Sequence, residues 1–79
     1  MPAITFNGTA RSVPRETTVT DLVAGATGRV LGPDGSPADG GRLGVAVAVD
    51  AAVVPRSLWS RTRVAEGQNI EIMTAVQGG

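Results

Sequence analysis

The chain of 79 residues contains no cysteine, histidine, lysine or tyrosine. These absences exclude a disulfide framework, a zinc site of the Cys/His type, a thiolate nucleophile and an imidazole general base. The seven acidic residues are spread along the chain, with no pair at the spacing of a catalytic motif. We therefore expect a protein that is not an enzyme in its own right.

Aromatic residues are few, and neither charge is in excess. Phe6 and Trp59 are the only aromatic residues, and seven arginines balance seven acidic residues. A nucleic-acid binder usually has a basic stripe with interleaved aromatics. No apolar run comes near the roughly 20 residues that span a bilayer, and the first residues lack the pattern of a signal peptide. The sequence predicts a cytoplasmic protein that binds neither nucleic acid nor membrane.

The apolar content indicates a single small domain over residues 1–79. Apolar residues make up 42% of the chain, which is ordinary for a globular domain and too high for a disordered one. Residues 28–42 are rich in Gly, Pro and Asp and have no periodicity, so we expect a mobile surface loop there. A phosphate-binding loop is excluded, because it needs a lysine and a helix directly after its glycines.

The first half of the chain predicts a β-hairpin followed by a short helix. The opening residues alternate and end at Asn7-Gly8, a pair typical of a type I′ turn, so a returning strand is expected over residues 9–13. Thr18 is a candidate N-cap, with Asp21 at the N3 position of a capping box. The apolar residues of the helix share one face, which we expect to pack in the core rather than bind a partner. They are Val19, Leu22, Val23 and Ala26.

Residues 44–49 form the strongest strand pattern in the chain. Valine and alanine alternate there, so both faces are apolar and we expect the strand in the centre of a sheet. A short strand over residues 52–54 should follow and end at Pro55, which cannot donate to a ladder. The turn after Pro55 should be irregular or 3₁₀, and should return Leu58 or Trp59 to the core.

The last strand is predicted over residues 70–76. Ile70 and Ile72 should face the core, while Glu71 and Met73 should face outward. Met73 is a candidate docking patch for a partner, because exposed apolar surface often marks such sites; a scattered surface methionine is the other interpretation. The order of elements predicts an α+β fold, a mixed sheet of four to five strands with one main helix packed on one face.

The sequence ends in Gly78-Gly79, a pair that average glycine usage places there by chance in roughly 0.5% of chains. The segments that precede the pair resemble the ThiS family of thiamine-biosynthesis sulfur carriers. The most specific part of the resemblance is Pro55-Arg56 followed by Trp59. The other matching segments are residues 4–8, 18–23, 49–54, 64–72 and 75–77.

The resemblance implies a ubiquitin-like β-grasp fold and a carrier whose working group is the C-terminal carboxylate of Gly79. It implies that an E1-like, ThiF-type adenylyltransferase activates Gly79 with ATP and magnesium, both used by that enzyme. A sulfur donor such as a cysteine desulfurase system would then form a thiocarboxylate, and a ThiG-type thiazole synthase would take the sulfur. The carrier itself would bind no cofactor and no metal.

Recognition by these partners is expected to involve an extended tail over residues 75–79. Besides Gly79, the tail residues expected to be recognised are Val76, Gln77 and Gly78. Glycine at the last two positions can thread a narrow channel because it has no Cβ. On the body of the domain, Met73 and Arg56 are the candidate partner surface.

Two departures from the family pattern keep other functions open. The loop over residues 28–42 is longer than usual, and Gln68-Asn69 stands where the family commonly has Asp after Gly67. A related carrier for molybdopterin, cysteine or thio-sugar biosynthesis is one alternative. A ubiquitin-like modifier that joins its terminus to a lysine is another, and a plain interaction module with an inert tail is a third.

Overall fold

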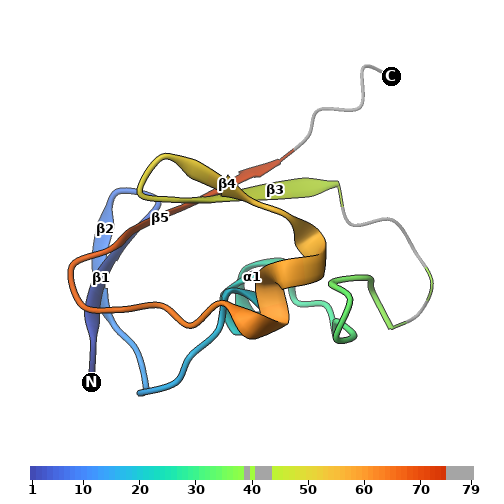
Figure 1. Cartoon of the computed structure of the whole chain (residues 1–79), viewed down its shortest axis with the longest axis horizontal. Coiled ribbons are helices and arrows are strands. Elements are labelled where there is room, and N and C mark those ends of the chain that lie inside the picture. Colours follow the sequence, from blue (N-terminus) through green and yellow to red (C-terminus); the bar gives the residue numbers. More distant parts are fainter. Residues whose placement is uncertain (39, 41–43, 75–79) are drawn as a thin grey trace.

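The computed structural model describes residues 1–38, 40 and 44–74, the last of these by its backbone (Figure 1). The elements in chain order are β1 (Ala3–Phe6), β2 (Thr9–Ser12), α1 (Val19–Thr27), β3 (Val45–Val49), β4 (Ala52–Val54), the 3₁₀ helix η1 (Arg56–Arg61) and β5 (Asn69–Thr74). None of the helices in this part of the chain is long and apolar enough to cross a membrane.

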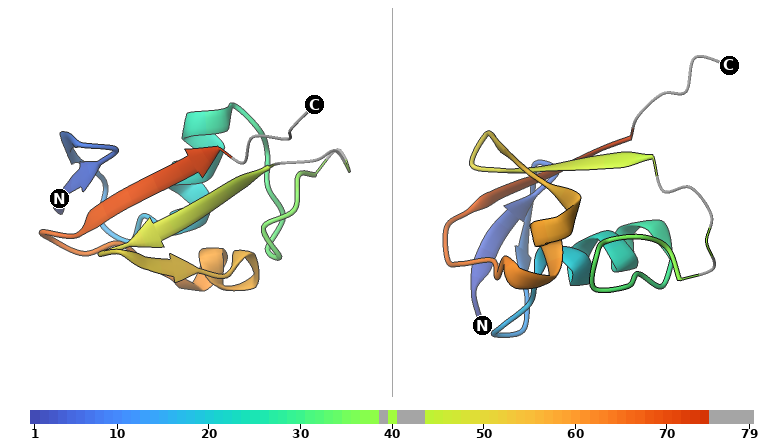
Figure 2. Two further views of the ribbon diagram at one scale, coloured as in Figure 1. Left: turned by 90° about the horizontal axis from the view of Figure 1, so that it is seen from above. Right: turned by 45° about the vertical axis from the view of Figure 1, so that its right-hand side comes forward.

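The five strands form one mixed sheet in the order β2-β1-β5-β3-β4. β1 and β5 are parallel, and the other three neighbouring pairs are antiparallel. α1 and η1 both lie against the same face of the sheet (Figures 1 and 2). The predicted α+β architecture is therefore confirmed. β3 has a neighbouring strand along each edge, as expected for a strand inside a sheet. The middle strand of the five, however, is β5.

Both tight turns of the sheet use paired residues with positive φ. Asn7 and Gly8 have φ of 48° and 81°, so the first hairpin has the turn that this dipeptide predicts. Asp50 and Ala51 connect β3 to β4 with φ of 50° and 69°. Ala51 has no sequence signal for this conformation, which the antiparallel pairing of β3 with β4 imposes on it.

The helix begins where the sequence predicts. The Asp21 N–H donates to the Thr18 hydroxyl at 3.2 Å, and the Thr18 N–H donates to the Asp21 carboxylate at 2.9 Å, which completes the capping box. Gly28 ends the helix in the left-handed conformation. The prediction that Ala26 packs in the core is wrong, because Ala26 is exposed and lines an open hollow between α1 and residues 11–17.

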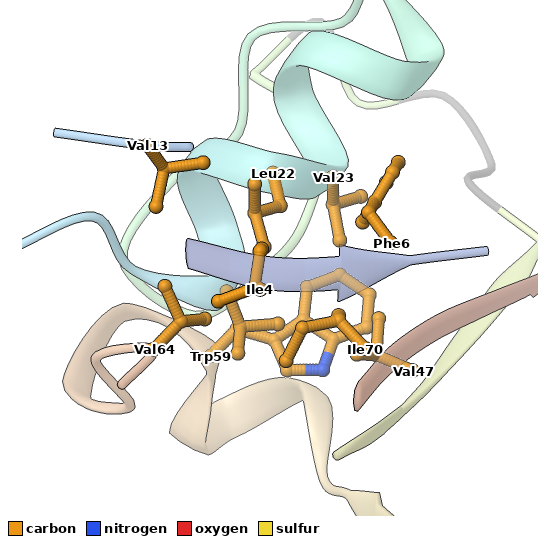
Figure 3. Close-up of a cluster of buried hydrophobic side chains, with 10 residues drawn as sticks. Ile4, Phe6, Val13, Leu22, Val23, Val47, Trp59, Val64 and Ile70 are labelled. Carbon is orange, nitrogen blue, oxygen red and sulfur yellow. The ribbon is translucent and has the colours of Figure 1, made fainter. Parts of the chain in front are cut away.

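The core lies between the sheet and the two helices (Figure 3). Its fully buried side chains are Val19, Val23, Val47, Trp59 and Ile70. Of the two residues that the sequence offers for the turn after Pro55, Trp59 enters the core at 1% exposure and Leu58 remains 43% exposed. Trp59 thus joins η1 to the sheet.

Part of the Gly/Pro-rich loop has a definite structure. Leu31 and Pro37 form an isolated antiparallel bridge, and the Ala38 N–H donates to the Val30 carbonyl at 2.7 Å. Gly35 and Pro37 are buried, and Leu31 packs against the core. Residues 30–38, called the docked turn below, are a small hairpin held against the body of the domain.

Candidate functional site

The four tail residues of the predicted site, Val76, Gln77, Gly78 and Gly79, lie outside the described residues. The structure does describe the strand from which they continue. β5 ends at Thr74, whose Cα pairs with Val45 of β3. The segment that carries the candidate terminus therefore leaves from the middle strand of the sheet.

β5 is anchored along both of its edges. It pairs with β3 over its last five residues and with β1 through Asn69 and Ile70. Ile70 is completely buried, and the Asn69 N–H donates to the Asp50 carboxylate at 2.9 Å. The strand that leads into the tail is thus tied to the core at its first residues.

The side chain of Asn7 extends the ladder beyond the end of β1. The Asn7 N–H donates to the Ile70 carbonyl at 2.9 Å, and the Ile72 N–H donates to the Asn7 side-chain oxygen at 2.8 Å. One residue thus supplies the hairpin turn and a partner for β5. Sequence reasoning identified the turn but missed the second role, which depends on a residue 65 positions away.

The open face of the sheet carries an apolar strip that includes one predicted residue. Met73, 46% exposed, lies opposite Ala46, and Val53, 68% exposed, lies opposite Ala48. Met73 faces outward, as its alternation with the isoleucines predicts. We call these four residues the open-face strip. Val53 was missed, because a three-residue strand does not show which of its faces is covered.

Arg56, the second candidate of the partner surface, is the first residue of η1. It is exposed, and its guanidinium carbon lies 5.8 Å from the centroid of the Trp59 ring, within the range of a cation–π contact. Met73 lies on the open face of the sheet, whereas Arg56 stands where the chain turns onto the helical face. The structure therefore does not join them into one cluster.

Next to Arg56 lies Asp34, whose pKa is held below its ordinary value of 3.8. The main cause is the Ser36 N–H, which donates to the Asp34 carboxylate at 3.0 Å, and the nearby charge of Arg56 acts in the same direction. Asp34 is therefore ionised at neutral pH. Its carboxylate is engaged within its own turn.

Two other features do not involve the predicted site residues. A hollow between α1 and the segment after β2 is lined by Arg11, Arg15, Glu16 and Asp21, among others. Within residues 1–38, 40 and 44–74, no three acidic side chains come close enough together to hold a metal ion.

A mixed sheet of order β2-β1-β5-β3-β4 with a helix across one face defines the ubiquitin-like β-grasp class. Within that class, the model of the ThiS family matches residues 4–79. The chain belongs to the ThiS family, the small sulfur carriers of thiamine biosynthesis, which are not catalysts themselves.

A solved structure has the same fold. The thiamine biosynthesis protein ThiS from Geobacter metallireducens superposes with a TM-score of 0.67 at 23% sequence identity. The alignment covers 98% of this chain and 99% of that one. At this identity the likeness shows the fold alone. Comparison with curated proteins gives no match.

Proposed function

We propose that the carboxylate of Gly79 carries the sulfur, as a terminal thiocarboxylate that donates sulfur to thiazole formation. The observation that supports this is the extent of the family match, which runs through residue 79 and so includes Gly78-Gly79. The strand that leads toward this pair is the middle strand of the sheet, with a neighbouring strand on each side, so its base is held by the fold.

The chemistry begins with a carboxylate that must be activated. An α-carboxyl group has a pKa of about 3.5, so at neutral pH it is ionised and a poor electrophile. One carboxylate oxygen of Gly79 attacks the α-phosphorus of ATP, which releases pyrophosphate and forms an acyl adenylate. Hydrosulfide, or its equivalent on a donor protein, then attacks the carbonyl carbon and AMP leaves. The net change at Gly79 is one oxygen replaced by one sulfur.

Partner enzymes supply the catalytic groups that the chain lacks. An E1-like adenylyltransferase of the ThiF type would bind ATP and magnesium, a cysteine desulfurase system would supply sulfur, and a ThiG-type thiazole synthase would consume it. Gly78 and Gly79 have no Cβ, which lets them enter a narrow channel and leaves the carbonyl open to attack. Val76 and Gln77 would enter the same channel and help the partner to recognise the tail. The open-face strip would provide apolar area for docking.

The test is intact mass spectrometry after incubation with ATP, magnesium, the adenylyltransferase and sulfide. The expected product is heavier by one oxygen-to-sulfur exchange, and a chain lacking Gly79 should not change. An unchanged wild-type mass, with an enzyme that modifies another carrier in parallel, would contradict the proposal. A lysine-containing protein in the mixture would reveal the modifier alternative as an isopeptide adduct.

A further inference from the structure

The docked turn is held against η1 by two contacts. Gly35 is buried with φ of +82°, and a Cβ built on it would overlap the Arg56 Cγ and lie 2.8 Å from the Arg56 carbonyl oxygen. The Ser60 hydroxyl donates to the Pro33 carbonyl at 2.8 Å. Only glycine at position 35 lets the turn approach the Arg56 side chain this closely.

The Arg56 side chain is consequently packed on both sides, but its guanidinium makes no hydrogen bond within the described part of the chain. Its aliphatic stem rests on Gly35, and its guanidinium faces the Trp59 ring. Among the described residues the guanidinium makes no hydrogen bond or ion pair; it acts on the nearby Asp34 carboxylate only through its charge, while that carboxylate accepts from the Ser36 N–H. An arginine offers five donors in a planar fork that matches a carboxylate. Because the stem is already fixed, binding a carboxylate costs less side-chain entropy.

This arginine lies at the end of the sheet from which the tail departs. β4 and β5 are both antiparallel to β3, so they run in the same direction, and Val54 and Ile72 both pair with Val47. Arg56 comes two residues after Val54, and Thr74 comes two residues after Ile72. Both residues therefore lie beyond Val47 in the same direction along the sheet. Figure 2 shows η1 and the docked turn at the end toward which β5 points.

The short tail limits how far a partner that acts on Gly79 can be from the end of β5. Residues 75–79 span at most about 17 Å when fully extended, so an enzyme that acts on Gly79 must approach the end of β5 this closely. A standard protein interface covers about 800 Å² on each partner, a patch roughly 30 Å across. β4 lies two strands from β5, about 10 Å away at the usual strand spacing, so a footprint of that size around the end of β5 reaches the end of β4, which Arg56 follows.

We propose that Arg56 and the docked turn form a specificity surface for the enzyme that adenylates Gly79, with a carboxylate of that enzyme receiving the guanidinium. The inference rests on the proposed function and adds to it a named contact. Gly35 and Ser60 act as positioning residues, because they hold the turn that fixes Arg56. The long Gly/Pro-rich segment thus has a role in partner choice.

The experiment measures ATP–pyrophosphate exchange at increasing carrier concentration, which separates KM for the carrier from kcat. Arg56→Ala should raise KM roughly three- to tenfold with kcat nearly unchanged, and the increase should shrink at high salt. Gly35→Ala should raise KM similarly. The double variant should be no worse than Arg56→Ala alone, because Gly35 acts through Arg56.

Gly40→Ala is the matched control. Gly40 belongs to the same loop and has a similar φ of +79°, but no atom of the described residues lies within 4 Å of a Cβ at that position. It imposes the same backbone strain without displacing Arg56, and its KM should equal that of the wild type. If Gly35→Ala does not fold, Ser60→Ala loosens the turn without adding bulk and should raise KM in the same direction.

An unchanged KM for Arg56→Ala, or fully additive effects of Gly35→Ala and Arg56→Ala, would overturn the specificity surface. If the wild type is adenylated and the folded variants match it, this inference alone fails. If the wild type is not adenylated at all, the proposed function fails first and the inference fails with it.

Discussion

The indole N–H of Trp59 donates to the carbonyl of Val54, five residues earlier, at 2.9 Å. The bond joins the end of β4 to the buried side of η1, where Trp59 fills the core. A tryptophan can be this deeply buried because its single polar atom has found a partner. The Pro55-Arg56 turn is therefore closed on the inside by Trp59 and flanked on the outside by the docked turn.

Replacing Trp59 by Phe should lower the free energy of unfolding by about 2 kcal/mol. Roughly 1 kcal/mol comes from the lost hydrogen bond and the rest from the smaller ring in a packed site. Urea denaturation followed by circular dichroism measures the change, since the variant has no tryptophan. Leu58→Ala, at an exposed neighbour, should cost clearly less. Equal losses in the two variants would contradict the assigned role of Trp59.

Asn7→Gly should cost about 1 kcal/mol, because it leaves the Ile72 N–H without its acceptor while still accommodating the φ of 48°. The Ile72 amide should also exchange with deuterium faster. Asn7→Asp keeps the acceptor oxygen and serves as the control, with little change in either quantity. Slow exchange at Ile72 in the glycine variant would show that the side-chain bond contributes nothing.

Thr20→Val should stabilise the domain by about 1 kcal/mol. The Thr20 hydroxyl is buried and has no hydrogen-bond partner among the described residues, so a methyl group of similar size removes an unsatisfied polar atom. Thr17→Val is the matched control and should destabilise the domain, because it removes the hydrogen bond that the Thr17 hydroxyl donates to the Pro14 carbonyl at 2.6 Å. Thermal denaturation should move the two midpoints in opposite directions, and a shared direction would refute this account.

Met73→Glu should leave stability nearly unchanged and lower kcat/KM for adenylation by about tenfold. Met73 is half exposed on the open-face strip, where a charge is tolerated in water but costly beneath a partner. Ala65→Glu adds the same charge in the turn before β5, at the other end of the strand, and should have little effect. Equal activities of the two variants would remove the open-face strip from the docking surface.

Local patterns predicted the local elements of this fold. The Asn7-Gly8 turn and the capping box of Thr18 with Asp21 depend on neighbouring residues, and the structure has both. The return of either Leu58 or Trp59 to the core was also expected, since Pro55 ends β4, and the structure buries Trp59. In each case, residues a few positions apart determine the geometry.

What the sequence did not predict depends on distant pairing. β5 rather than β3 takes the middle of the sheet, because β1 pairs with β5 across more than 60 residues. Ala26 continues the apolar face of α1 but lies beside a hollow that none of the described side chains fills. The contact of Gly35 with Arg56 has no periodic signal, because it depends on the shape of an aperiodic turn.

The middle position of β5 has a mechanical consequence. A partner that draws residues 75–79 into its channel pulls along the axis of this strand, whereas the ladder hydrogen bonds to β1 and β3 lie across that axis. The load is therefore a shear shared by all these bonds at once, instead of a peeling force that opens them one at a time. A pull on the terminus should therefore not open β5 one hydrogen bond at a time.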